Sequence, residues 1–332
     1  MRPNPKHFVI VLLLLCYSAC VCAVAAANPE LLRLESSVQA MGSTYSVVLY
    51  GADREQLEEA AELAFAEAKR LDEELSNYKP ESPWSQVNRF AAERPVPVPA
   101  ELFDLLSACL NYSKLSDGAF DITVGPLMRV WGFYKGSGHL PKPGLVKTAL
   151  ASVGYKGILL DSKTRTVRFA KKGVEMDPGG IGKGFAVDRM VDVLRKAGIQ
   201  IALVSGSGSS IYGMGAPPGE KGWTISIRDP RDETKTVQDI MLHDESLSTS
   251  GSYEKFFEAE GKIYAHIMDP RTGFPAQGML SVSVITPHTI DSEAWCKPFF
   301  INGRAWAAQH KPERTRAFFC EDKAEQQCVW LQ

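Results

Sequence analysis

The residues best placed to do chemistry lie in one run, 176–199, which reads MDPGGIGKGFAVDRMVDVLRKAGI. Four glycines and Lys183 stand between an acidic turn and an amphipathic helix pattern. Glycine lets the backbone approach a ligand closely, and the N-terminus of a helix presents free N–H groups to an anion. The run therefore predicts a cradle for a phosphate or pyrophosphate, formed by main-chain amides near residues 179–184. The alternative interpretation is a glycine-rich connector before a packed helix.

The spacing within this run excludes two common nucleotide-binding motifs. Lys183 is followed by Gly184 rather than by Ser or Thr, and Asp177 stands where a Walker loop has its first glycine. The G-x-G-x-x-G spacing of a dinucleotide-binding Rossmann fold is absent as well. The run is therefore a phosphate-binding candidate outside those two classes.

The elements that must position this run follow from the hydrophobic pattern. Apolar residues recur at helical spacing in 54–76, 99–116 and 292–309. Pro298 should bend or shorten the last of these helices. Strand patterns occupy 36–50, 155–176, 204–215, 223–230, 236–242, 264–268 and 281–286. The polar segment 76–88, with Pro80 and Pro83, and the glycine-rich segment 118–133 are predicted to be loops.

The order of these elements indicates a fold class. Strand patterns neighbour one another as often as they neighbour helices, which favours an α+β fold with largely antiparallel mixed sheets and packed helices over a doubly wound parallel sheet. The chain has 332 residues, of which 45% are hydrophobic and 23% charged, an ordinary globular composition. No linker is evident, so 28–332 is expected to form a single compact unit. The net charge of −2 gives no support for a nucleic-acid partner.

The first 27 residues have the composition of a secretory signal. Arg2 and Lys6 precede the apolar run 8–15, and small residues follow as far as Ala27. We therefore expect residues 1–27 to be a signal peptide and the protein to be exported to the periplasm. Two alternatives stay open: an uncleaved membrane anchor facing the periplasm, and a lipoprotein attached through Cys20.

Four cysteines remain after this segment: Cys109, Cys296, Cys320 and Cys328. Cys320 and Cys328 lie close together in the sequence, and an oxidising compartment would favour a disulfide between them. No C-x-x-C pair or His/Cys cluster indicates zinc.

Six blocks together resemble a known family, the FAD:protein FMN transferases (ApbE-like), and occur in the family's order over nearly all of the exported part. The blocks are 41–44 (MGST), 75–78 (LSNY) with Asn88 following, 118–127 (GAFDITVGPL) with 131–133 (WGF), 177–184 (DPGGIGKG) with Ala186 and Asp188, 248–251 (STSG) and 266–273 (HIMDPRTG). One such block alone would be weak, whereas six in order make chance resemblance an unsatisfactory explanation.

The resemblance implies a reaction and a set of partners. A member of this family binds FAD and Mg²⁺, cuts the pyrophosphate, joins FMN to a threonine hydroxyl of an acceptor protein and releases AMP. The acceptor would carry a D-G-x-[ST] sequence, and the N-terminal pattern adds association with the inner membrane. The glycine cradle and a metal would neutralise charge on the phosphates.

The residues that the resemblance assigns to the site fall into two groups. The cofactor-binding group comprises Met41, Tyr78, Ala119, Phe120, Asp121, Asp177, Gly179, Gly180, Lys183 and Met268. The catalytic group comprises His266, Asp269 and Lys183, with His266 as the candidate base for the acceptor hydroxyl and Lys183 as a point charge near the pyrophosphate.

Most of these residues also have a structural interpretation. His266 could bond across the adjacent turn, and 269–273 is a competent turn sequence whatever the function. Phe120 and Asp121 could be an apolar anchor and an N-cap before a short helix. Tyr78 could pack on its own loop instead of stacking on adenine, and Asp177 could cap the cradle loop through backbone N–H groups.

Two departures from the family pattern concern charge. Ser210 stands where the family has an acidic residue. At the metal site, the resemblance implies the carbonyl of Gly180 plus an Asp and a Thr four residues apart; this chain has Glu293 and Lys297 there, with Asp291 as a competing carboxylate. Mg²⁺ prefers oxygen ligands, so Glu293 could hold it, but a protonated lysine cannot. The ammonium would repel the cation, or take its place and pair with phosphate.

These departures leave alternatives to a transferase. One is an FAD-binding protein with lost or weak transferase activity. The other is an FAD pyrophosphatase, in which water accepts the FMN group.

Overall fold

The computed structural model describes residues 31–134, 136, 138–323 and 328–331. The predicted signal peptide, residues 1–27, lies outside the described residues. No helix of the described part is both long and apolar enough to span a bilayer.

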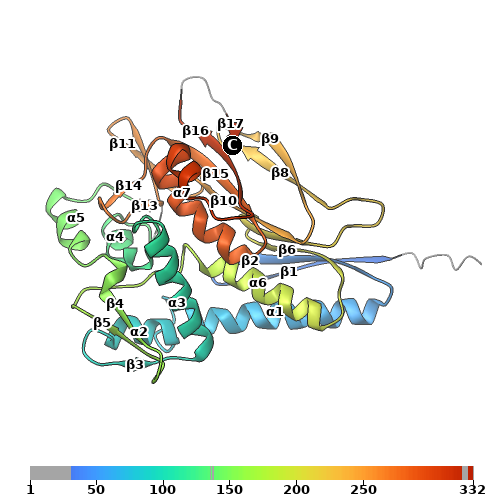
Figure 1. Cartoon of the computed structure of the whole chain (residues 1–332), viewed down its shortest axis with the longest axis horizontal. Helices are drawn as coiled ribbons and strands as arrows, with labels where there is room; N and C mark the ends of the chain where they lie inside the picture. The colour runs from blue at the N-terminus through green and yellow to red at the C-terminus, as the bar shows by residue number, and fades with distance from the viewer. Residues whose placement is uncertain (1–30, 135, 137, 324–327, 332) are drawn as a thin grey trace, which may run out of the picture. The chain divides into compact units, whose positions relative to one another are not determined.

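One antiparallel sheet organises the described chain (Figure 1). It has eight strands among the described residues, in the order β1-β2-β6-β7-β10-β15-β16-β17, and every neighbouring pair is antiparallel. The strands are β1 (Leu32–Ala40), β2 (Ser43–Gly51), β6 (Ile201–Gly206), β7 (Ser210–Met214), β10 (Glu245–Gly251), β15 (Met279–Thr286), β16 (Arg316–Glu321) and β17 (Cys328–Trp330). The predicted α+β class with largely antiparallel sheets is confirmed.

Three helices cover one face of this sheet: α1 (Arg54–Leu75), α6 (Gly182–Lys196) and α7 (Thr289–His310). The long helix predicted at 54–76 exists because its apolar residues recur on one face, where Leu57, Ala64 and Leu71 are fully buried. The interruption of α7 lies at Gly303, whose φ of 78° is not helical, although Pro298 is inside the helix. The sequence had placed the bend at the proline.

The opposite face of the sheet carries a hairpin of β8 (Trp223–Asp229) and β9 (Asp232–Leu242). Successive side chains of a strand point to opposite faces, so Val284 of β15 packs on the α7 side and Ile285 on the hairpin side. Both strands of this hairpin were predicted from the sequence. On the same side, Cys320 and Cys328 form the predicted disulfide, with an S–S distance of 2.05 Å, and it joins β16 to β17.

Smaller elements gather beyond one end of the main sheet (Figure 1). They are the helices α2 (Pro83–Phe90), α3 (Ala100–Leu115), α4 (Gly125–Val130) and α5 (Pro143–Leu150), the turns η1 (Ile122–Val124) and η2 (Tyr155–Gly157), and the strands β3 (Val96–Pro97), β4 (Ile158–Asp161), β5 (Thr166–Phe169), β11 (Phe256–Ala259), β12 (Lys262–Ala265), β13 (Met268–Asp269) and β14 (Phe274–Pro275). The β4–β5 pair confirms the hairpin predicted within 155–176.

The loop predicted at 76–88 is wrong in its second half, where α2 begins. Pro83 lies in the first turn of this helix, and Ser82 caps it by accepting the Ser85 N–H at 3.0 Å. A proline at that position fits a helix because the N–H that it lacks has no partner within the helix. The segment 118–133 likewise contains η1 and α4 rather than only loop.

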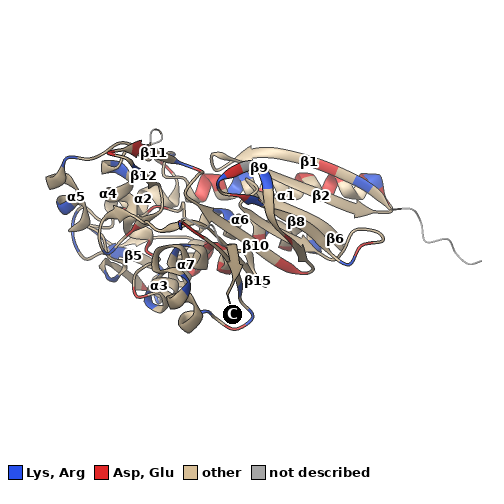
Figure 2. Ribbon diagram, turned by 90° about the horizontal axis from the view of Figure 1, so that it is seen from above, with Lys and Arg blue, Asp and Glu red and all other residues tan. Residues whose placement is uncertain are grey.

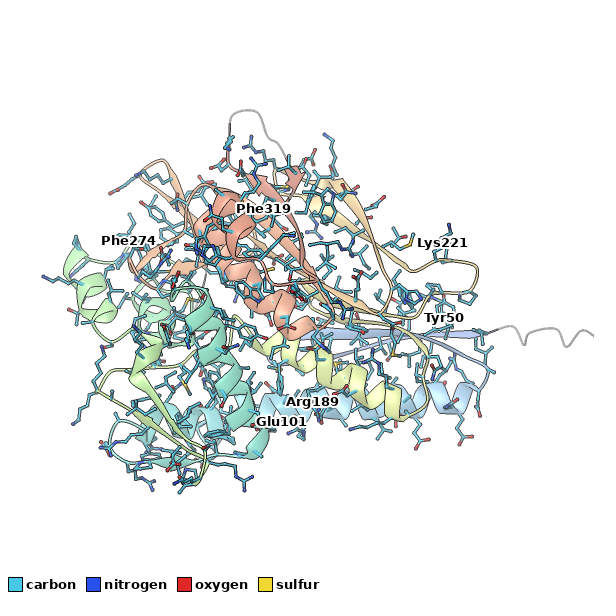
Figure 3. All side chains as sticks on the ribbon, in the orientation of Figure 1. Tyr50, Glu101, Arg189, Lys221, Phe274 and Phe319 are labelled. Carbon is cyan, nitrogen blue, oxygen red and sulfur yellow. A yellow bond between two sulfur atoms is a disulfide. The ribbon has the colours of Figure 1, made fainter. Side chains whose placement is uncertain are left out.

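Charged residues are spread over helices and strands of both groups of elements (Figure 2). Between the groups, Arg189 of α6 faces Glu101 of α3, and their side-chain N and O atoms are 2.8 Å apart (Figure 3). This ion pair links the helix that follows the cradle loop to the smaller elements that form the other side of the pocket described next.

Candidate functional site

A single pocket collects most of the residues that the sequence had singled out. Its cavity volume is about 90 Å³, and the pocket is partly open to solvent. It is lined by Ala119, Phe120, Asp121, Ile122, Val124, Met128, Asp177, Gly179, Gly180, His266, Ile267, Met268, Pro270 and Lys297. These residues come from the segment before η1, from η1 itself, from α4, from the cradle loop, from the β12–β13 region and from α7.

Five predicted site residues are not in that lining: Met41, Tyr78, Lys183, Asp269 and Glu293. The side chain of Met41 nevertheless reaches the cradle loop, since its Cε would be 3.2 Å from a Cβ placed on Gly182. Their roles remain predictions. The walls also include five residues that sequence reasoning missed, namely Ile122, Val124, Met128, Ile267 and Pro270, whose only signal was that they lie inside or next to the matched blocks.

The cradle loop uses most of its own amides. Gly179 N–H donates to Asp177 Oδ1 at 2.8 Å, and the N–H groups of Ile181 and Gly182 donate to the carbonyl of Pro178 at 3.1 and 2.8 Å. Gly184 N–H donates to Glu293 Oε2 at 2.5 Å. Four amides of the predicted cradle are therefore already bonded within the protein, and an anion here would rely more on nearby side chains.

Gly184 has a packing role that the sequence did not reveal. A Cβ at this position would lie 2.4 Å from the carbonyl oxygen of Thr289, so only glycine lets α6 approach the start of α7 this closely. Asp188 fixes the same junction by accepting the N–H groups of Thr289 and Ile290 at 2.7 and 2.8 Å. The cradle block thus also contains the residues that pack α6 against the start of α7.

Asp177 is held in place by two asparagines. Its Oδ2 accepts from Asn77 Nδ2 at 3.1 Å, and Asn88 exchanges two hydrogen bonds with the main chain of Met176, at 2.7 and 2.9 Å. Burial raises the pKa of Asp177, and the bond from the Gly179 N–H opposes this shift. The predicted loop-capping interpretation is confirmed, while Asn77 and Asn88, which belong to the 75–88 block, act here as positioning residues.

Asp121 is the N-cap of η1, as its structural interpretation predicted. Its Oδ1 accepts from the N–H and hydroxyl of Thr123 at 2.8 and 2.6 Å, and its Oδ2 accepts the Tyr155 N–H at 2.6 Å. Burial raises the pKa of this carboxyl, whereas the bonds from Thr123 lower it. Next to it, Phe120 is 2% exposed and packs edge-on against Tyr112. These contacts hold the side chains of Phe120 and Asp121 in place where they line the pocket.

His266 presents its imidazole to the pocket. Its Nδ1 lies 3.3 Å from the carbonyl oxygen of Lys255, and a carbonyl can only accept, so the N–H of the neutral ring belongs at Nδ1 and the lone pair at Nε2. Burial, together with the charges of Lys297, Lys183 and Lys255, lowers the pKa of His266 to about 4. The ring is therefore neutral near pH 7 and has one nitrogen able to accept a proton.

Asp269 and Tyr78 have partners outside the pocket. Asp269 holds Arg271 through two hydrogen bonds of 2.9 and 3.0 Å to the guanidinium, inside the predicted 269–273 turn. Tyr78 is 73% exposed, and its hydroxyl donates to the carbonyl of Tyr134 at 3.4 Å. An aromatic ring this exposed remains available for stacking on a flat ligand.

Two lysines and one glutamate form the charged part of the site. Glu293 is 1% exposed; its Oε1 has no hydrogen-bond donor among the described residues, but lies 3.4 Å from Lys183 Nζ and 4.0 Å from Lys297 Nζ. Lys297 Nζ also donates to the Glu293 carbonyl at 3.3 Å. Burial lowers the pKa of Lys297, and the charge of Glu293 opposes that shift.

This donor set does not fit Mg²⁺. Among the described residues, no group of three or more His, Cys, Asp or Glu side chains could hold a metal ion. The one free carboxylate oxygen already faces two ammonium groups. A divalent ion bound to it would lie about 4 Å from an ammonium nitrogen, where the repulsion amounts to about 8 kcal/mol at an effective dielectric constant of about 20.

Ser210, the other departure from the family pattern, is 1% exposed and accepts from the hydroxyl of Ser248 at 3.3 Å. Ser248 and Ser292 are bonded in turn at 2.8 Å. Hydroxyl groups therefore satisfy one another where the family pattern has a carboxylate.

Comparisons with known proteins agree with this architecture. The model of the ApbE family matches residues 41–319. A relative from Klebsiella pneumoniae named FAD:protein FMN transferase is 32% identical over 286 residues, which cover 84% of this chain and 86% of the relative. The crystal structure of an ApbE protein from Thermotoga maritima has a TM-score of 0.82 and 29% identity, covering 90% of this chain and 97% of that one. The apo flavinyl transferase ApbE from Pseudomonas stutzeri has a TM-score of 0.79 and 28% identity, covering 90% and 94%.

The fold and the pocket thus define a protein built like the flavin transferases. The chain belongs to the ApbE family.

Proposed function

We propose that this protein is an FAD:protein FMN transferase that moves FMN from FAD to a threonine hydroxyl of an acceptor protein and releases AMP. The observation that carries the proposal is the convergence of three separate motif blocks, 118–127, 177–184 and 266–273, on one pocket. Two relatives that are each 32% identical to this chain are named for this activity.

The chemistry assigned to the pocket balances without a further reactant. The hydroxyl oxygen of the acceptor threonine forms a bond to the FMN phosphorus, the bond from that phosphorus to the bridging oxygen breaks, and AMP leaves with the bridging oxygen. The proton of the hydroxyl passes to Nε2 of His266, which is neutral near pH 7. Apolar side chains such as Phe120 and Met268 give the flavin ring a wall to pack on.

The proposal includes export. The composition of residues 1–27 favours it, and the Cys320–Cys328 disulfide is a bond that persists in oxidising compartments. Expression of the full chain in a bacterium, followed by N-terminal sequencing of the processed protein, tests this part. A new N-terminus close to Ala27 supports export, and an intact Met1 in the cytoplasmic fraction contradicts it.

The experiment for the activity uses purified protein, FAD and a peptide with a D-G-x-T sequence. We expect a covalently flavinylated peptide, detected by mass, and one AMP for each modified peptide. The matched control is the same peptide with alanine in place of the threonine, which should give neither product.

A second candidate function is favoured by Lys297, which stands where the family pattern has a threonine ligand and faces Glu293. If transfer has been lost, the protein binds FAD without consuming it, and no AMP appears with any acceptor. AMP release that continues with the alanine peptide would identify the pyrophosphatase alternative instead.

A further inference from the structure

We propose that the ammonium group of Lys297, paired with Glu293, replaces a divalent cation at the diphosphate of FAD, so that this protein binds FAD without a metal ion. The inference rests on the proposed function in one respect, since it takes FAD as the ligand. It concerns the source of positive charge in the pocket and not the reaction that follows.

Lys297 reaches the cradle loop from α7. Its Cε would be 3.5 Å from a Cβ placed on Gly180, in ordinary van der Waals contact, and Phe120 lies at a similar distance from the same point. Lys297 is also one of the residues that line the pocket. The end of the lysine side chain therefore occupies the space beside Gly180, at the place where the family resemblance puts a metal ion.

The two carboxylate oxygens of Glu293 have different partners. Oε2 accepts the Gly184 N–H, which fixes the carboxylate against the first turn of α6. Oε1 has no hydrogen-bond donor within the described part of the chain and faces Lys183 and Lys297 at 3.4 and 4.0 Å. A metal ion bound to Oε1 would have to displace both ammonium groups, whereas an ammonium group needs no further ligand there.

The net charge of this cluster also favours a diphosphate. One carboxylate and two ammonium groups leave the cluster of Lys183, Glu293 and Lys297 with one net positive charge. An ammonium group carries three donors and binds phosphate oxygens as a point charge. Because four amides of the cradle loop are already bonded, these lysines are the main source of positive charge left to the loop. Lys297 is thus a binding residue that supplies positive charge at the place where the family pattern has a cation.

The test measures FAD binding by the full chain, stripped of flavin, through quenching of flavin fluorescence. Titrations are run in EDTA and in Mg²⁺, so the readout does not depend on turnover. For the wild type we expect the two dissociation constants to agree within about threefold, a difference of less than about 0.7 kcal/mol.

Substitution of Lys297 distinguishes FAD binding that depends on the lysine charge from FAD binding that depends on a metal ion. Lys297→Thr, which restores the ligand type of the family pattern, should weaken binding at least about tenfold in EDTA and regain it in Mg²⁺. Lys297→Arg keeps the charge and should bind FAD without a metal ion. The matched control is Lys311→Thr, an exposed lysine at the end of α7 that should change neither titration. Thermal melting of each variant establishes that it is folded.

The outcomes keep the two proposals apart. Wild-type binding that appears only with Mg²⁺ overturns this inference and leaves the transferase proposal standing. Binding by Lys297→Thr in EDTA that equals the wild type also overturns it. Absence of FAD binding by the folded wild type in both titrations contradicts the proposed function itself.

Discussion

The carboxylate of Glu293 accepts a hydrogen bond from the main-chain N–H of Gly184 at 2.5 Å, across 109 positions of sequence. This bond ties α7 to the first turn of α6, and Glu293 also faces Lys297, which lines the pocket. The same two residues determine how closely the helices approach and where the free carboxylate oxygen points. Packing and charge in this site therefore depend on one contact.

Glu293→Gln should destabilise the fold. The amide oxygen can still accept the Gly184 N–H, so the change replaces the negatively charged oxygen between Lys183 and Lys297 with an NH₂ group that cannot accept from either lysine. Two shielded ammonium groups are then left without a counter-ion, and we expect the free energy of unfolding to fall by about 2 kcal/mol. Urea denaturation measures the change.

The control for that substitution is Glu245→Gln. Glu245 pairs with Arg316 at 2.6 Å, but the side chains are 32% and 49% exposed. An exposed pair contributes little, so the unfolding free energy should change by less than about 1 kcal/mol. Equal losses in the two variants would contradict the electrostatic role given to Glu293.

Gly184→Ala should be damaging because of packing alone. The added methyl group would lie 2.4 Å from the Thr289 carbonyl oxygen, and a backbone atom cannot move aside without shifting α7. We expect a loss of about 1–3 kcal/mol in the free energy of unfolding, the range for overpacked sites. The matched control is Gly144→Ala in α5, where a Cβ meets nothing within 4 Å. A variant of Gly184 as stable as this control would show that the helices are not constrained there.

The sequence predicted the features that depend on local pattern. The apolar spacing within α1 and the short separation of Cys320 and Cys328 each involve neighbours along the chain, and both predictions are confirmed. The motif blocks predicted the pocket. Eight of the binding and catalytic residues assigned from these blocks line it: Ala119, Phe120, Asp121, Asp177, Gly179, Gly180, His266 and Met268.

What the sequence could not supply depends on tertiary contacts. Pro83 is typical of a loop in the sequence, yet it is the first residue of α2. The helix begins there because Ser82, the preceding residue, is its N-cap. The glycine pattern predicts that the backbone at Gly184 approaches a ligand. The space beside it is instead filled by α7, which lies far away in sequence. The amides of the cradle were expected to be open. Three of them bond to Asp177 and Pro178 within the loop, and only the fourth, at Gly184, has an acceptor far away in sequence, Glu293.

Breaking the Cys320–Cys328 disulfide should weaken the edge of the main sheet. The bond closes a short loop between β16 and β17, with a sequence separation of 8. Constraint of the unfolded chain by a loop of that size contributes about 2 kcal/mol. We expect the reductant dithiothreitol to lower the melting temperature of the wild type and to leave that of Cys328→Ser unchanged. A melting temperature that dithiothreitol does not alter in the wild type would contradict the role of the bond.

The last prediction concerns the pH dependence that His266 imposes. Its pKa is lowered to about 4 by burial and by the nearby lysines, so the neutral, proton-accepting ring persists as the pH falls well below 6.5. The rate of FMN transfer should therefore decline on the acid side near pH 4 and not near pH 6.5. Stability follows the same group: because the unfolded chain binds this proton more tightly, the folded state loses up to about 3 kcal/mol as the pH falls from about 6.5 to about 4.

Substitution of His266 distinguishes a role as general base from a role in binding FAD. His266→Ala should lower kcat at least about 100-fold, the usual contribution of a general base, and leave the dissociation constant of FAD nearly unchanged. It should also remove the loss of stability between about pH 6.5 and about pH 4 that the buried ring causes. His243→Ala serves as the control, since that ring is 56% exposed and pairs with Asp244 outside the pocket. If His266→Ala weakens FAD binding and leaves kcat intact, the ring is a wall of the pocket and another group takes the proton.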